Sequence, residues 1–113
     1  MKITIKATQL DLTPSIKTYI EEKIGSLGRL LVPFEREGEC IAEMEIGRTT
    51  HHHHKGEIFR AEVNLHLPGR SLRAEHAAVD MRVAIDRVRS MMRFEITKYR
   101  AAHLMRRVFR RTK

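Results

Sequence analysis

Apolar and polar residues alternate in several stretches of the chain, and this alternation predicts strands with one buried face. In residues 1–7, Ile3 and Ile5 lie on one face, and lysines and threonines lie on the other. The same period recurs over 39–46 and 58–67, and a short strand over 71–75 follows a Pro-Gly turn pair. The residues expected to face the core are Cys40, Ala42, Met44, Ile46, Phe59, Ala61, Val63, Leu65, Leu67, Leu72 and Ala74.

Between the first two strands, the apolar residues take the spacing of a helix. Thr13 is placed to cap this helix, and Pro14 suits its first turn. Gly28 is expected to end it as a left-handed cap. Residues 30–38, which include Pro33, are expected to form a connection. The apolar stripe of the helix is Ile16, Tyr19, Ile20, Ile24 and Leu27.

A second, longer helix is expected from about Ala77 to the C-terminus. At about 1.5 Å per residue it would be roughly 50 Å long, so its end should project beyond the body. The element order is then βαβββα. Because each strand has one polar face, the sequence predicts an α+β fold, a four-stranded sheet with both helices packed on its apolar face. The apolar side of the long helix is Met81, Ile85, Val88, Met92, Ile96, Tyr99 and His103.

Six arginines share one edge of the long helix, within an arc of about 40°. Residues 80–113 carry eleven Lys and Arg against three acidic residues, while the charges of residues 1–79 balance, so the formal charge of +8 lies in the helix. A solvated face, with cations at the negative end of the helix dipole, accounts for the last turns. It does not account for the earlier arginines, which lack acidic neighbours on that edge, so a polyanionic partner is favoured. This arginine stripe is Arg82, Arg89, Arg93, Arg100, Arg107 and Arg111.

Composition narrows the kind of partner. At 113 residues the chain is expected to be a single domain, 1–113, with a basic helical tail from about residue 104. It has no apolar run long enough for a membrane span and no secretion signal, and its single cysteine suits a reducing cytosol. The net charge then points to nucleic acid. Only 5% of the residues are aromatic, so contacts to phosphates are expected rather than a platform for stacked bases.

Four consecutive histidines, His51 to His54, lie between two predicted strands. Histidines bind transition metals, but a defined site needs ligands that converge from fixed positions, so we expect no metal site and no cofactor. Cys40 is expected in the core and not as a nucleophile. No serine-hydrolase, zinc-protease, CxxC or phosphate-loop motif is present, so we expect no enzyme and no small-molecule substrate.

Four apolar residues lie on the flank of the long helix opposite the arginine stripe: Met91, Phe94, Met105 and Phe109. Met91 and Phe94 are expected to contact the first helix, which must run alongside on the same sheet face. For Met105 and Phe109, contact with that helix and weak self-association both stay open, since an exposed apolar patch usually marks a partner.

Three segments of the chain carry a family resemblance. They are MKITIKATQLDLTPSIKTYIEEKIGSLGRL, HHKGEIFRAEVNLHLPGRSLRAE, and DMRVAIDRV with the later Lys98-Tyr99-Arg100. Over nearly its whole length the chain resembles the short form of the bacterial ribosome hibernation-promoting factor and ribosome-associated inhibitor A family. The predicted fold is like that of a double-stranded-RNA-binding domain. The resemblance implies a cytoplasmic protein that binds the small ribosomal subunit in the messenger and transfer RNA channel and silences translation in stationary or starved cells.

The resemblance also implies site residues. By position, basic residues of the family correspond to Lys23 and Arg29 on the first helix and to Lys98 on the second, and Arg87 is their neighbour. These residues and the arginine stripe are expected on different flanks. The resemblance further implies that the additional C-terminal domain of long family members is absent. The positions where this chain departs from the basic residues of the family are Ser26, Met91 and Phe94.

The sequence therefore predicts a non-enzymatic translation inhibitor that binds small-subunit ribosomal RNA through phosphates and blocks the channel sterically. A homodimeric protein-interaction module without RNA binding, formed through Met105 and Phe109, is one alternative. A metal-dependent enzyme that uses His51 to His54 is another. The candidate RNA-binding residues are Lys23, Arg29, Arg82, Arg87, Arg89, Arg93, Lys98, Arg100, Arg107 and Arg111.

Overall fold

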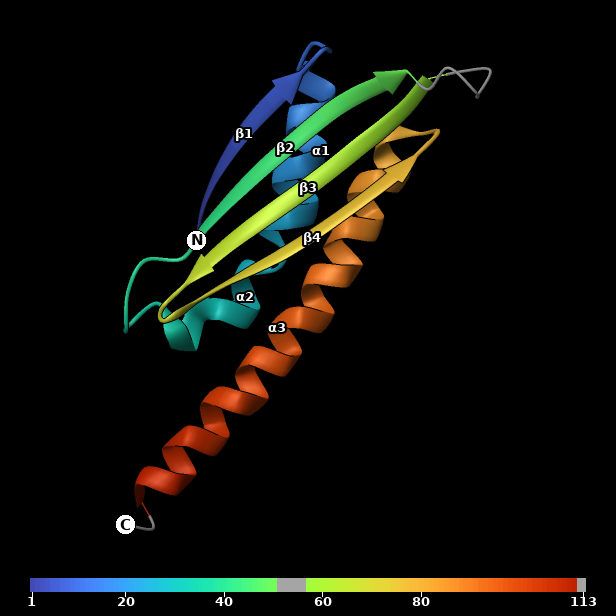
Figure 1. The fold of residues 1–113 in the computed structure, drawn as a ribbon. Helices are drawn as coiled ribbons and strands as arrows, with labels where there is room; N and C mark the ends of the chain where they lie inside the picture. Colours follow the sequence, from blue (N-terminus) through green and yellow to red (C-terminus); the bar gives the residue numbers. More distant parts are fainter. Residues whose placement is uncertain (51–56, 112–113) are drawn as a thin grey trace.

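The protein folds as a sheet with helices on one of its faces (Figure 1). The computed structural model describes residues 1–50 and 57–111, and it leaves aside the side chains of Thr50, Glu57, Arg107, Phe109, Arg110 and Arg111. The predicted βαβββα order and α+β fold are confirmed. The elements are β1 (Lys2–Thr8), α1 (Pro14–Gly25), α2 (Gly28–Leu31), the 3₁₀ turn η1 (Val32–Phe34), β2 (Ile41–Thr50), β3 (Glu57–Leu67), β4 (Arg70–Ala78) and α3 (Met81–Arg111).

The sheet has the strand order β1-β2-β3-β4. β1 lies parallel to β2, and the other two pairs are antiparallel. A parallel pair needs a crossover connection, and the segment that contains α1 supplies it. The register brings the predicted inward residues into rows, such as Met44 opposite Val63 and Val63 opposite Ala74. These rows are buried under the helices, as the alternation predicts, except that Phe59 is only partly buried.

The long helix α3 closes the core along its apolar side. The predicted stripe from Met81 to Tyr99 is buried, and Ala84 joins it. Tyr99 is 1% exposed; its ring meets Phe34 edge-on at 5.0 Å, and its hydroxyl donates to the carbonyl of Pro68 at 2.9 Å. Beyond this anchor the C-terminal part of α3 extends past the sheet (Figure 1), and the molecule is 60 Å long.

The start of α3 differs from the predicted position near Ala77. β4 continues through Ala78, which pairs with Phe59 of β3, so the last strand is longer than expected. Asp80 then caps the helix: its carboxylate accepts from the backbone N–H of Arg82 at 2.8 Å. The alanines suit a helix by propensity, but the hydrogen bonds of the sheet hold them in the strand.

The prediction that Gly28 ends the first helix in a left-handed conformation is wrong. α1 ends at Gly25, and Ser26 and Leu27 stay right-handed, so the chain runs on into α2, which begins at Gly28. Residues 30–38 are also more than a connection, since Leu31 and Phe34 are buried in the core. Burial of these apolar side chains favours two compact helical turns over an extended loop.

Two further predictions concern single positions. Cys40 is buried, as expected, and burial raises the pKa of its thiol, so it is a core residue. The histidines at 51–54 lie outside the described residues.

Among the residues that are described, no helix has both the length and the apolarity that crossing a membrane takes.

Candidate nucleic-acid interface

The open face of the sheet carries balanced charge. Its described side chains include four acidic residues, and Lys2, Lys6, Arg60 and Arg73 supply four cations. Arg60 pairs with Glu62 at 2.8 Å and with Glu75, and Arg73 contacts both carboxylates. The hydrogen bond from Arg60 holds the pKa of Glu75 below its usual range. A face with this balance has no net attraction for a polyanion.

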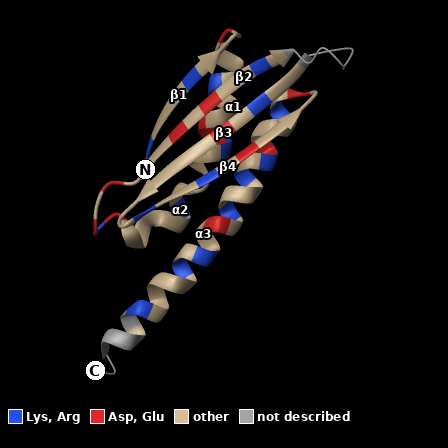
Figure 2. Ribbon diagram, in the orientation of Figure 1, with Lys and Arg blue, Asp and Glu red and all other residues tan. Residues whose placement is uncertain are grey.

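The helical side of the molecule has the opposite character. Residues 81–111 hold ten Lys and Arg against Asp86 and Glu95. Figure 2 shows cations along α3 as far as its grey C-terminal end, with more on α1 and α2 behind the sheet. Charge therefore distinguishes the two faces, and the helical side is the candidate nucleic-acid interface.

The first arginine of the stripe contacts α1. The Arg82 guanidinium donates to the hydroxyl of Ser15 at 2.8 Å and lies over the ring of Tyr19, 5.0 Å from its centroid. Lys23 approaches the same ring at 5.4 Å. Cations of two helices thus gather at one aromatic side chain.

An acidic residue holds this group together. The hydroxyl of Tyr19 donates to Asp86 Oδ1 at 2.6 Å, and Lys23 Nζ lies 4.0 Å from the same oxygen. The hydrogen bond to Asp86 raises the pKa of Tyr19, and partial burial adds to the shift. Asp86 therefore fixes Tyr19 and Lys23 against α3.

The second arginine of the stripe makes a similar contact. Arg89 is half-buried, and its Nε donates to the hydroxyl of Ser26 at 3.0 Å. Ser26 in turn donates to the carbonyl of Lys23 at 2.6 Å. The helices α1 and α3 thus meet along a polar seam, which we define as the α1–α3 seam: Ser15, Tyr19, Lys23, Ser26, Arg82, Asp86 and Arg89.

The α1–α3 seam corrects one prediction about the two candidate sets. The sequence places Lys23 on a different flank from the arginine stripe, but it lies beside Arg82 and shares Tyr19 with it. The roles of Ser15, Tyr19, Ser26 and Asp86 as the contact between the helices were not predicted. A signal was present, because the first three recur along one edge of α1 at helical spacing.

The next two arginines of the stripe are directed to solvent. Arg93 and Arg100 are exposed, and within the described part of the chain neither guanidinium has an ion-pair partner. The same holds for two other exposed arginines, which also have no ion-pair partner among the described residues: Arg29 at the start of α2 and Arg87 on the far flank of α3. Lys98 pairs with Glu95 at 2.9 Å. The side chains of the last two predicted residues, Arg107 and Arg111, lie outside the described residues.

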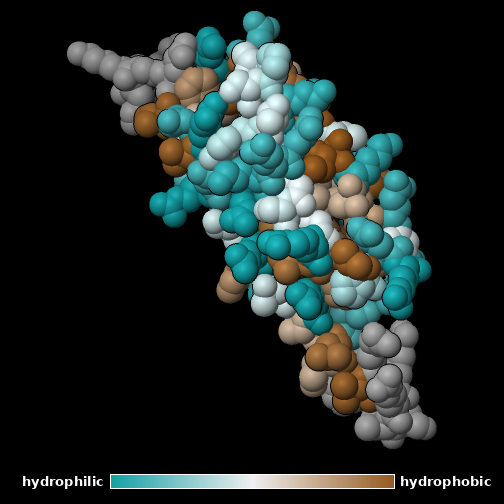
Figure 3. Space-filling model, turned by 180° about the vertical axis from the view of Figure 1, so that it is seen from behind, coloured by the Kyte–Doolittle hydropathy of each residue, from teal (hydrophilic) through white to brown (hydrophobic). Residues whose placement is uncertain are grey.

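The prediction that Met91 and Phe94 contact the first helix is wrong. They are 43% and 64% exposed, because α1 lies along the edge that carries Arg82 and Arg89. Met105 is 53% exposed, and Leu104 beside it is exposed as well. Figure 3 shows apolar areas between polar ones on the helical side and toward the projecting end.

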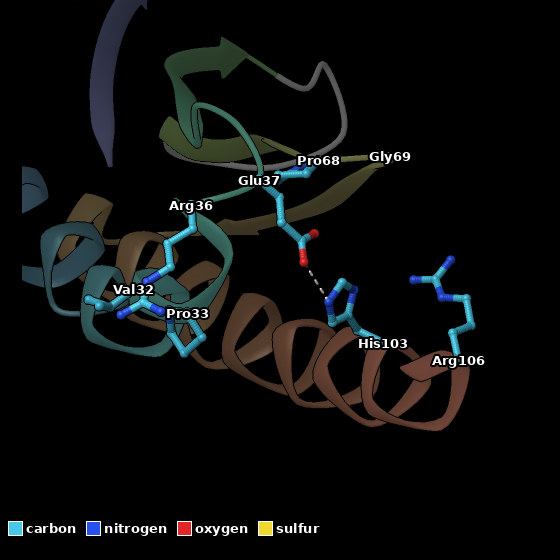
Figure 4. A pocket seen from close by; sticks show the side chains of 8 residues that line it. All are labelled: Val32, Pro33, Arg36, Glu37, Pro68, Gly69, His103 and Arg106. Carbon is cyan, nitrogen blue, oxygen red and sulfur yellow. Dashed lines mark ion pairs between the residues drawn. The ribbon is translucent and has the colours of Figure 1, made fainter. Parts of the chain in front are cut away.

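A hollow of about 740 Å³ lies where the projecting part of α3 passes the loop after η1 (Figure 4). His103 Nε2 lies 3.0 Å from a carboxylate oxygen of Glu37, and the imidazole stacks edge-on against Phe34 at 5.0 Å. Arg36 and Arg106 lie on either side of this pair. The pair joins the loop to α3 and separates the two cations, so the hollow is not an assembled anion site.

Known proteins resemble this chain over most of its length. Residues 3–103 match the family described as Sigma 54 modulation protein / S30EA ribosomal protein. The chain is 35% identical over 86 residues to a ribosome hibernation promoting factor of Acidithiobacillus ferridurans, a match that covers 76% of this chain and 100% of that protein. It is 30% identical over 102 residues to a ribosome hibernation promotion factor of Lactococcus lactis subsp. cremoris, covering 88% of this chain and 50% of that relative.

Solved structures show the same architecture. The N-terminal domain of Protein Y from Thermus thermophilus matches with a TM-score of 0.71 and 27% identity, covering 88% of this chain and 99% of that one. A ribosomal subunit interface protein from Coxiella burnetii has the same fold, with a TM-score of 0.67 and 20% identity over 89% of this chain and 99% of that one. The chain belongs to the S30EA family of ribosome hibernation and modulation factors.

Proposed function

We propose that this protein binds the small ribosomal subunit in the cytoplasm and lies with its helical side against ribosomal RNA. In this position it occupies the channel used by messenger and transfer RNA, and it inhibits translation in stressed or stationary cells. The action is steric and needs no catalytic group. The family supports association with the ribosome.

One observation carries the choice of face: among the described residues, cations outnumber acidic side chains on α3, whereas the numbers of basic and acidic side chains are equal on the open sheet face. Arginine suits this role because its planar fork donates two hydrogen bonds to a phosphate. Structured RNA is recognised mainly through its shape, phosphates and 2′-hydroxyls. A rigid helix with cations at fixed intervals can therefore bind it without contacts to the base edges.

The contacts of the α1–α3 seam support a division of roles among the cations. Arg82 and Arg89 donate hydrogen bonds to Ser15 and Ser26 across the seam. We infer that their remaining N–H groups bind the RNA. Three other arginines are exposed and form no ion pair within the described structure: Arg29, Arg93 and Arg100. We infer that these three supply most of the phosphate contacts and that the seam keeps them in register.

Co-sedimentation with purified small subunits at several salt concentrations tests this proposal. Each neutralised phosphate releases counterions, so the logarithm of affinity should fall linearly with the logarithm of salt concentration. An in vitro translation assay on the same preparation should show inhibition that weakens along the same salt series. Binding that is insensitive to salt would contradict contact through phosphates.

A second candidate function is self-association without RNA binding. The exposed Leu104 and Met105 on the projecting end of α3 favour it. The arginines on the same end oppose it, since like charges repel when two copies meet. Light scattering separates the two candidates: a monomer that binds small subunits supports the first, and a dimer that does not bind them supports the second.

A further inference from the structure

The ring of Phe94 is exposed on the side of α3 that faces away from the sheet. We call this side the outer crest: Arg87, Phe94 and Lys98. Of the aromatic side chains that the structure describes, it alone falls in the exposed class, with 64% of its surface accessible. It lies about 120° around the helix from the arginine stripe, on the side away from the core. An aromatic ring in this position adds nothing to the core, so its presence needs another explanation.

One cation contacts this ring, and two others lie nearby along the same helix. Lys98 Nζ lies over it, 5.0 Å from the ring centroid. The same ammonium group forms an ion pair with Glu95 at 2.9 Å. Arg87 stands two turns earlier on the same flank, and Arg93 is the neighbour of Phe94 in the chain; both are exposed. A flat apolar face thus lies next to one cation in contact and within two helical turns of two more.

From this arrangement we infer that Phe94 is a base-stacking position, which receives one unpaired nucleobase while Arg87, Lys98 and Arg93 hold the adjoining phosphates. The inference rests on the proposed RNA binding and names a contact within it. Unpaired bases in RNA stack on exposed aromatic side chains, and every base has a face that suits such a ring.

Charge argues for this occupant over a second copy of the chain. A second copy would bring its own Arg87 and Lys98 against the same cations, which is unfavourable. An unpaired nucleotide offers a planar apolar face and a negative phosphate together. The base face matches the ring of Phe94, and the phosphate matches the cations beside it.

The chain contains no tryptophan, so Phe94→Trp introduces a single fluorophore at the stacking position. The ring is largely exposed, and the substitution should leave the fold intact. We would titrate this variant at low salt with an oligoadenylate single strand and with a fully paired RNA duplex of the same length. The expected result is strong quenching by the single strand and weak quenching by the duplex. Thr4→Trp, on the open sheet face, is the matched control and should respond to neither.

Affinity for small subunits gives a second readout. Phe94→Leu keeps an apolar side chain but removes the ring, and it should weaken co-sedimentation roughly tenfold. Its salt slope should equal that of the unmodified protein, since no charge is removed, whereas Lys98→Gln should lower the slope. Phe94→Trp should bind at least as well as Phe94→Leu.

Several results would overturn the inference. Phe94→Trp that is not quenched by the single strand, or Phe94→Leu that binds small subunits like the unmodified protein, would show that the ring is not used. A change of mass in light scattering on Phe94→Leu would identify the crest as a contact between proteins. If the unmodified protein still binds small subunits in a salt-dependent manner, the proposed function holds even when the stacking inference fails. If the unmodified protein does not bind small subunits at all, the proposed function itself is wrong.

Discussion

The hydroxyl of Tyr19 donates to Asp86 Oδ1 at 2.6 Å, and this hydrogen bond joins α1 to α3. Lys23 Nζ lies 4.0 Å from the same oxygen, so the carboxylate also has a cationic partner. The arginines on α3 are held at fixed positions relative to α1 as a result. The stability of this contact can be measured apart from RNA binding.

Removal of that hydroxyl should destabilise the fold modestly. Tyr19→Phe should lower the free energy of unfolding by about 1 kcal/mol near pH 8, a typical net value for a partly exposed hydrogen bond. The hydrogen bond raises the pKa of Tyr19 in the folded state. Its contribution is therefore complete below about pH 10, where the phenol of the unfolded chain ionises, and is lost as pH rises through the higher folded value. Denaturant unfolding of both proteins at about pH 8 and about pH 11 checks this, and a difference between them that grows at the higher pH would contradict it.

The two exposed stripe arginines should contribute affinity without stability. Arg93→Gln combined with Arg100→Gln should weaken small-subunit binding and lower the salt slope by about one unit for each phosphate that is no longer neutralised. The free energy of unfolding should change by less than about 0.5 kcal/mol, because both side chains are exposed. The matched control is Lys2→Gln with Lys6→Gln, which removes the same charge from the open sheet face and should bind almost normally. Equal weakening of the two double variants would mean that only net charge matters.

Ser26 and Arg89 should prove to be energetically coupled. Ser26→Ala and Arg89→Gln should each lower the free energy of unfolding by about 1 kcal/mol, and the double variant should lose less than the sum of the two, because both remove the same hydrogen bond. Ser26→Ala should leave the salt slope of small-subunit binding unchanged. Strict additivity in this cycle would show that the contact contributes nothing to the folded state.

Tyr99 should anchor α3 more strongly than Tyr19 does. Its hydroxyl donates to the Pro68 carbonyl from a position that is almost fully buried, and burial raises its pKa. Tyr99→Phe leaves that carbonyl without its donor and should cost about 1–3 kcal/mol. Thermal unfolding measures the destabilisation. Hydrogen exchange should also accelerate in α3 beyond residue 99, and exchange that stays unchanged there would place the anchor elsewhere.

Periodicity alone predicted the layers of this fold. The inward rows of the sheet and the apolar side of α3 from Met81 to Tyr99 are buried as expected, since burial of one face follows directly from a period of two or of 3.6 residues. Element ends were less accurate. Ala77 and Ala78 fit a helix or a strand equally well, and the pairing of β4 with β3 decides between them.

The contact between the helices could not be predicted in the same way. A helical wheel shows that Met91, Phe94 and the arginines occupy different edges of α3, but it does not show which edge faces α1. Apolar character favoured the edge with Met91 and Phe94, whereas the polar side chains Ser15, Tyr19 and Ser26 of α1 select the arginine edge. This choice depends on tertiary packing, and it reverses the roles expected for the two flanks.

The decisive measurement is a density map of the protein bound to the small ribosomal subunit. We expect α1 and α3 to lie against ribosomal RNA in the messenger and transfer RNA channel, with Arg93 and Arg100 next to phosphates and the open face of the sheet turned away. A map in which the sheet face meets the RNA, or in which the protein binds outside the channel, would show that the proposed binding mode is wrong.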